Sequence, residues 1–133
     1  MNIYREHILD HYRNPRHYGK LAQPTVTVDE TNPVCGDHLH IELSIEHQKI
    51  REIAFEGGGC AISLAAASVL AEELAGRPVQ EVTKFTDAKM LSLLGVPLSP
   101  TRTKCGLLAL SGLRAGLRQY TESHGRHEAN QSR

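Results

Sequence analysis

The stretch LHIELSIEHQKIREIAFEGGGC, residues 39–60, decides the fold of this 133-residue chain. Its first eight positions alternate apolar and polar residues, as a β-strand does when one face is buried. After the short connection EHQKI, the segment REIAFE (51–56) predicts a strand that returns beside the first. Two strands with so short a link pair antiparallel. The apolar positions of the first strand are Leu39, Ile41, Leu43 and Ile45.

Toward the N-terminus the chain predicts one more strand and one helix. TVTVDET (25–31) has the same period of two, so three consecutive strands form an antiparallel meander with one buried face. Residues 3–13 carry a helical apolar stripe that ends at Asn14-Pro15, because proline disfavours helix in the residue before it. This helix is short and marginally stable by itself, so we expect it to be mobile.

Toward the C-terminus the apolar period becomes helical. A helix from Ala61 is expected to stop at Gly76, and the last helix is expected from about Cys105 to Tyr120. The segments between them are predicted as two short helices and a proline-punctuated loop, at 78–85, 86–95 and 96–104.

These elements predict an α+β fold, a three-stranded antiparallel sheet with helices packed on one face. We expect a single domain over residues 1–122, followed by a polar, frayed tail at 123–133.

Composition excludes several classes of protein. Lys+Arg and Asp+Glu are both 15, so the net charge of zero argues against nucleic-acid binding by bulk positive charge. No run of 18 apolar residues predicts a membrane span, and the charged N-terminus lacks the apolar core of a secretory signal. We therefore expect a cytoplasmic protein. Three cysteines in that compartment argue against a disulfide framework.

Each cysteine falls at the end of a predicted element. Cys35 lies in the turn between the first two strands, Cys60 follows three glycines, and Cys105 opens the last helix. A helix N-terminus favours the thiolate, which applies to Cys60 and Cys105. Lys104 and Arg102 add positive charge beside Cys105. Such junctions are where binding sites are usually built.

Three thiolates suit zinc or an iron–sulfur cluster and leave one tetrahedral position open. Asp37 stands two residues from Cys35 and is our candidate for that position, ahead of His38. A carboxylate oxygen is a harder and more exchangeable ligand for iron than a thiolate, which suits a site that releases its cargo.

Plainer interpretations stand beside this hypothesis. A single cysteine is most often a small buried residue, and Asp37 alone is most simply a turn residue. His38 and His40 have the opposite parity to the buried positions, so they are expected to face solvent. A structural zinc domain and a cysteine hydrolase are the remaining alternatives.

Four motifs together resemble the NifU N-terminal-like family of iron–sulfur cluster assembly scaffolds, the IscU and SufU proteins. The resemblance covers roughly residues 3–120. The motifs are YREHILDHYRNPRHYG (4–19), NPVCGDHL (32–39), GGGCAISLAAAS (57–68) and RTKCGLLAL (102–110).

The resemblance implies a scaffold that is not itself an enzyme. It implies that Cys35, Asp37, Cys60 and Cys105 bind a transient [2Fe–2S] cluster, or Zn²⁺ in its place. It also implies a cysteine desulfurase as sulfur donor and apo iron–sulfur proteins as acceptors. Cys35 is the candidate persulfide acceptor and Cys105 the alternative one.

The third cysteine motif is similar to one branch of the family, and the spacing before it is similar to the other. IscU-type scaffolds carry His before the third cysteine and an LPPVK segment that an Hsp70-type chaperone binds. This chain has Lys104 and no LPPVK, so we do not expect that chaperone as a partner. Arg102-Thr103-Lys104-Cys105 is similar to the RxKC pattern of the SufU branch, whereas the 45-position gap between Cys60 and Cys105 leaves little room for the usual SufU insertion. The alternative function is therefore a zinc-containing, SufU-type protein that accepts persulfide sulfur.

Overall fold

The computed structural model describes residues 3–34 and 36–131. Five helices and three strands occur in this part of the chain, and no helix among them is both long and apolar enough to cross a membrane. In chain order the elements are α1 (Ile3–Arg13), β1 (Val26–Asn32), β2 (Asp37–Glu46), β3 (Lys49–Gly58), α2 (Ala61–Leu74), α3 (Val79–Thr83), α4 (Asp87–Leu94) and α5 (Pro100–Gln131).

The three strands form one antiparallel sheet in the order β1-β2-β3, as the alternating pattern predicts. Asn32 pairs with Asp37 at one end of the β1–β2 hairpin, and Val26 pairs with Leu43 toward the other. His47 and Gln48 join β2 to β3, and both have positive φ angles, as a two-residue type I′ turn requires. β3 is longer than predicted, because it continues through Gly57 and Gly58.

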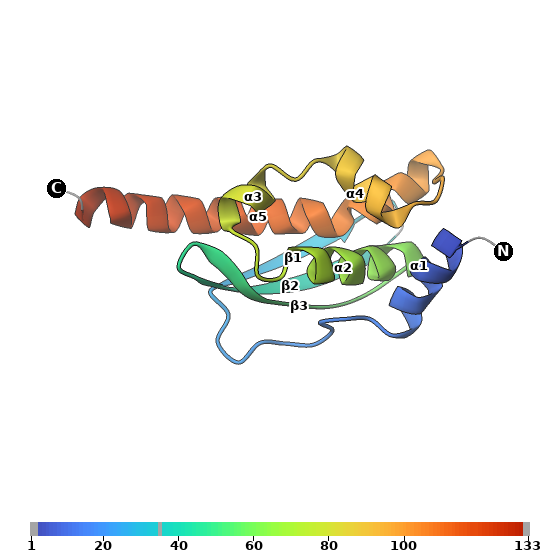
Figure 1. Ribbon diagram of the computed structural model, residues 1–133, viewed down its shortest axis with the longest axis horizontal. Coiled ribbons are helices and arrows are strands. Elements are labelled where there is room, and N and C mark those ends of the chain that lie inside the picture. The colour runs from blue at the N-terminus through green and yellow to red at the C-terminus, as the bar shows by residue number, and fades with distance from the viewer. Residues whose placement is uncertain (1–2, 35, 132–133) are drawn as a thin grey trace.

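The helices cover one face of the sheet, which confirms the predicted α+β architecture (Figure 1). α5 packs on β1 and β2, while α2 packs on β3 and lies between α1 and α5. The alternating apolar positions of β2 point into this interface and are fully buried or nearly so. The largest buried side chains between the layers include Leu39, Leu43, Phe55, Leu70, Leu110 and Leu113.

The last helix begins earlier than the sequence analysis predicted. The prediction of a loop through residue 104 is wrong, because α5 starts at Pro100. Ser99 caps the helix: its Oγ accepts from Arg102 N at 3.3 Å, and its carbonyl accepts from Thr103 N at 2.8 Å. Proline is well suited to the first helical position, where its missing N–H has no partner to lose.

α5 also continues beyond the predicted end at Tyr120, as far as Gln131. The polar segment at 123–133 is therefore helical over most of its length. The division into a domain at 1–122 and a tail remains a prediction.

The second face of the sheet is partly covered by the segment between α1 and β1. Gly19 N donates to Phe55 O at 2.8 Å beside β3, and Leu21 N donates to Glu42 Oε1 at 2.8 Å in the middle of the sheet. Glu42 is thus buried, although its parity in β2 predicts exposure. His38 is exposed as expected, whereas His40 is half-buried between Asp29 and Glu42, at 2.9 and 2.8 Å.

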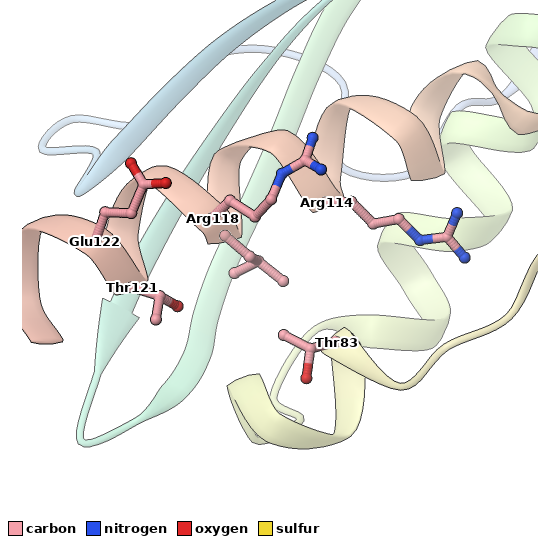
Figure 2. A pocket seen from close by; sticks show the side chains of 6 residues that line it. Thr83, Arg114, Arg118, Thr121 and Glu122 are labelled. Carbon is pink, nitrogen blue, oxygen red and sulfur yellow. The ribbon is translucent and has the colours of Figure 1, made fainter.

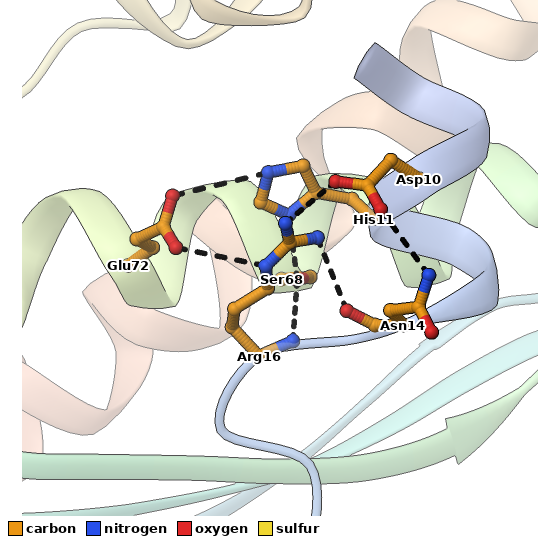
Figure 3. A network of polar contacts seen from close by, with 6 residues as sticks. All are labelled: Asp10, His11, Asn14, Arg16, Ser68 and Glu72. Carbon is orange, nitrogen blue, oxygen red and sulfur yellow. Dashed lines mark hydrogen bonds and ion pairs between the residues drawn. The ribbon is translucent and has the colours of Figure 1, made fainter. Parts of the chain in front are cut away.

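α1 is fastened to α2 by a polar network (Figure 3). His11 is 2% exposed, and its Nδ1 lies 2.7 Å from Ser68 Oγ. The same hydroxyl accepts a hydrogen bond from Arg16 N at 2.8 Å. The Arg16 side chain pairs with Asp10 at 2.5 Å and with Glu72 at 3.7 Å. The structure shows α1 docked, and its mobility remains a prediction.

Candidate metal centre

The β1–β2 turn places a carboxylate at one end of the sheet. Asn32 shapes this turn: its carbonyl accepts from Gly36 N at 2.8 Å, and its side-chain Oδ1 accepts from Val34 N at 3.2 Å. Asp37 then begins β2 with its side chain turned into the protein, 1% exposed.

The glycines before Cys60 make room for this carboxylate. A Cβ on Gly59 would lie 2.2 Å from Asp37 Oδ1, and the φ angle of Gly59 is +129°. Only glycine combines that backbone conformation with so close an approach. The chain's own Asp37 fills this room.

Cys60 is the N-cap residue of α2, as predicted. Its backbone N–H donates to Asp37 Oδ1 at 2.8 Å, and its thiol lies 3.7 Å from Asp37 Oδ2. Cys60 is half-buried, so its thiol is within reach of solvent.

Cys105 reaches the same place from α5, but not from the helix terminus. It lies in the second turn and is completely buried, which corrects the prediction that it opens the helix. The helix N-terminus therefore does not explain a thiolate at Cys105. Lys104 is exposed while Cys105 is buried, so its ammonium group does not share the environment of the thiol.

The three elements bring one carboxylate and two thiols together. Ligand atoms of Asp37, Cys60 and Cys105 all lie within 4.8 Å of one another. Two sulfurs and one oxygen at such separations can converge on one cation of the zinc class and leave a position for a further ligand. The residues present therefore fit a metal, and the separation of 23 to 68 positions in sequence explains why no local spacing motif reveals the site.

Hydrogen bonds favour the charged forms of these groups. Burial raises the pKa of Asp37, but hydrogen bonds from Ser63 Oγ and from Cys60 N outweigh it, so this pKa lies below its ordinary value. Burial also raises the pKa of the Cys60 thiol, yet hydrogen bonding by the backbone and hydroxyl of Ser63 brings it below the ordinary value despite the nearby Asp37 charge. Anionic oxygen and sulfur are the forms that bind cations.

The other two predicted candidates are Cys35 and His38. Cys35 lies outside the described residues, so its role as ligand and sulfur acceptor remains a prediction. His38 lies over Gly58, with Cε1 3.0 Å from the position of a Cβ at that glycine, and is exposed. It alternates with the inward-facing Asp37 along β2 and is not among the three grouped ligands.

Sequence reasoning missed two residues that line the cluster. Asn32 Nδ2 lies 4.0 Å from Cys105 Sγ, and Ser63 Oγ donates to Asp37 Oδ2 at 2.7 Å. The position of Ser63, three residues after the N-cap Cys60, was an available signal, because side chains at that position face back toward the cap.

A separate hollow lies between α3 and the second half of α5 (Figure 2). Arg114 donates to Asp87 Oδ1 at 2.6 Å and to Phe85 O at 2.7 Å, and thereby holds the α3–α4 connection on α5. Asp37, Cys60 and Cys105 do not line this hollow. Its lining residues are Thr83, Arg114, Leu117, Arg118, Thr121 and Glu122.

The fold and the cluster define an α+β domain with a thiol–carboxylate site at the end of its sheet. The family described as "NifU-like N terminal domain" matches residues 3–127. The chain therefore belongs to this family, which confirms the resemblance drawn from its motifs.

Relatives from both branches of the family are similar to the chain. It is 31% identical to the zinc-dependent sulfurtransferase SufU of Bacillus subtilis, over 86% of this chain and 89% of that protein. It is 32% identical to the iron–sulfur cluster assembly scaffold protein IscU 1 of Archaeoglobus fulgidus, over 93% of this chain and 80% of that protein. The crystal structure of the N-terminal part of a NifU-like protein from Brucella abortus shares the fold, with a TM-score of 0.73 at 21% identity over 90% of this chain and 95% of that one.

Proposed function

We propose that the chain is a scaffold on which a transferable [2Fe–2S] cluster is assembled. The observation that carries the proposal is the convergence of Asp37, Cys60 and Cys105 within 4.8 Å, in a chain of this family. Cys35 is the proposed fourth ligand. The cluster is cargo: iron and sulfur arrive separately and leave together for apo iron–sulfur proteins.

The proposed sulfur source is the persulfide of a cysteine desulfurase. A site thiolate attacks the outer persulfide sulfur, a new S–S bond forms, and the desulfurase cysteine leaves as thiolate, so this exchange needs no outside oxidant or reductant. A thiol reductant then supplies the two electrons that convert each transferred sulfur into the sulfide of the cluster. Cys35 is the proposed acceptor. Cys105, the alternative acceptor, is completely buried, so an incoming persulfide would reach it only after this end of the molecule opened.

The scaffold proposal is tested by anaerobic reconstitution with iron, cysteine and a desulfurase. The wild-type chain is expected to gain the visible charge-transfer absorption of a [2Fe–2S] cluster, and Cys35→Ser and Cys60→Ser to gain little of it. Absence of these bands in the wild type, with no change in Cys35→Ser, would overturn the proposal.

The second candidate is sulfur transfer with resident zinc at the same four ligands. Two observations favour it: the Arg102–Cys105 motif, and the similarity to the relative named a zinc-dependent sulfurtransferase. Zinc would hold the thiolates in a redox-inert state. Displacement of one ligand by the docked desulfurase would free a thiolate, which we assign to Cys35.

Metal and sulfide analysis of protein purified anaerobically without added metal separates the two candidates. Iron with acid-labile sulfide supports the scaffold. One equivalent of tightly bound zinc, with a large rise in desulfurase turnover on adding the chain, supports sulfur transfer. In both cases we propose that the chain acts with a desulfurase, without an Hsp70-type chaperone. The cytoplasmic location stays a prediction from the sequence.

Asp37→Ala is expected to slow cluster transfer to an apo-protein while leaving the fold intact. The carboxylate oxygen is the ligand that iron exchanges most readily, so its removal closes the route by which release begins. The transfer rate is followed by circular dichroism of the cluster. Faster release in Asp37→Ala would contradict this role.

A further inference from the structure

We infer that Ser63 is a positioning residue that sets the orientation of Asp37 toward the bound metal. Ser63 is completely buried in the first turn of α2. Its Oγ contacts every described member of the cluster: it lies 2.7 Å from Asp37 Oδ2, 3.7 Å from Cys60 Sγ and 3.3 Å from the backbone carbonyl of Cys105.

The two oxygens of Asp37 are held by different donors. Oδ1 accepts from the backbone N–H of Cys60 at 2.8 Å, and Oδ2 accepts from the Ser63 hydroxyl at 2.7 Å. The second contact of Oδ2, with the Cys60 thiol, is longer at 3.7 Å. Ser63 therefore supplies the shorter contact to Oδ2 and, together with the Cys60 N–H on Oδ1, fixes the rotation of the carboxylate.

Oδ2 is also the oxygen that lies toward the Cys60 sulfur, so it is the one that shares a cation with the thiolates. A carboxylate oxygen has two lone pairs and can accept the serine hydrogen and bind a cation together. The hydroxyl has one hydrogen and two acceptors, Asp37 Oδ2 and the carbonyl of Cys105. When the metal binds, the Ser63 hydroxyl can keep donating to Asp37 Oδ2 or rotate to donate to the carbonyl of Cys105. In either case it still makes a hydrogen bond.

This inference rests on the proposed function, because it requires Asp37 to be a metal ligand. Partners that hydrogen-bond to a ligand typically contribute about 10- to 100-fold to metal affinity. The test uses Zn²⁺ as the probe, with its affinity for the full chain measured by competition with a chromophoric chelator.

Ser63→Ala is expected to weaken zinc binding about 10- to 100-fold in the wild-type background and to have little effect in Asp37→Ala, because its action passes through Asp37. Alanine is a good helix former, so circular dichroism should show an unchanged fold. Ser63→Thr retains the hydroxyl and should stay within about threefold of the wild type. Ser68→Ala, which removes the other buried hydroxyl of α2, is the matched control and should not change zinc affinity.

Equal weakening by Ser63→Ala with and without Asp37 would overturn the inference, since it would show a general effect on packing. An unchanged affinity in Ser63→Ala, while Asp37→Ala binds zinc more weakly, would overturn it and leave the proposed function standing. Zinc binding by Asp37→Ala as tight as that of the wild type would overturn both.

Discussion

Two buried serines of α2 have different roles: one belongs to the candidate metal centre and the other to the contact with α1. Ser63 and Ser68 are both completely buried and lie five residues apart. Five residues turn an α-helix by about 140° beyond a full turn, so the two hydroxyls face different neighbours. Ser63 faces the thiol cluster, whereas Ser68 faces α1.

The partners of the two hydroxyls explain the difference in role. Ser63 donates to a carboxylate whose remaining lone pairs lie beside two thiols, so the group can still bind a cation. Ser68 accepts from Arg16 N and contacts His11, and these residues are in turn satisfied by Asp10 and Glu72. We call the contacts of Asp10, His11, Arg16, Ser68 and Glu72 the closed network, because these groups satisfy one another and stabilise the contact between α1 and α2. We call the contacts of Asp37, Cys60, Ser63 and Cys105 the open network, because its carboxylate and thiols can still bind a cation.

Gly59→Ala should have the largest effect on the open network. The new Cβ would meet Asp37 Oδ1, and the residue would also keep a positive φ angle. We expect a loss of about 3 kcal/mol of unfolding free energy and zinc affinity at least as weak as in Asp37→Ala. Urea unfolding and chelator competition measure the two effects.

Gly19→Ala is the control for backbone strain. Gly19 has a similar φ angle of +135°, with nothing within 4 Å of an added Cβ. Gly19→Ala should lower the unfolding free energy by about 1–2 kcal/mol and leave zinc affinity unchanged. Equal loss of zinc affinity in the two variants would refute the role given to Gly59.

Ser68→Ala should break the closed network and spare the site. It leaves Arg16 N and buried His11 without their shared partner, at a cost of about 2 kcal/mol. Urea unfolding should show this loss, and amide exchange in α1 should become faster. Full protection of α1 in this variant would show that Ser68 does not hold the helix.

His11 should make the closed network sensitive to acid. Burial, together with nearby Arg16 and His7, lowers its pKa, while Glu72 and Asp10 act in the opposite direction. His11 therefore binds a proton more readily in the unfolded chain than in the folded one. The contribution of neutral His11 to the unfolding free energy is present above about pH 6.5 and is lost as the pH falls below it. Unfolding free energies between pH 7.5 and 5.5 should decrease for the wild type and less so for His11→Gln. A parallel decrease in both proteins would contradict this assignment.

His40, on the opposite face of the sheet, should give the smallest effect, with the opposite sign. Hydrogen bonds with Glu42 and Asp29 raise its pKa, so the folded chain binds the proton more tightly. Its stabilisation is present below about pH 6.5 and is lost as the pH rises through the raised pKa. The pair with Asp29 is exposed, so His40→Gln should lose less than about 1 kcal/mol, and more at pH 5.5 than at pH 8.5. A larger loss at pH 8.5 would contradict the assignment.

The sequence by itself determined the strands, α1, α2 and the chemistry of the candidate ligands. Alternation along β2, the proline after α1 and the glycines before α2 act between residues close in sequence, so their patterns can be recognised without a structure. The motifs around Asp37, Cys60 and Cys105 indicated the family for the same reason.

Only the tertiary structure decided which distant groups meet. The start of α5 at Pro100 buries Cys105 in the second helical turn, the segment before β1 buries Glu42, and Ser63 reaches Asp37 across 26 positions of sequence. The first and third of these features depend on how α2 and α5 pack against the sheet, and the second depends on how the segment before β1 crosses the opposite face. No local pattern encodes that packing. The thiols and the carboxylate were visible in the sequence, but the hydrogen bonds that aim the carboxylate exist only in the fold.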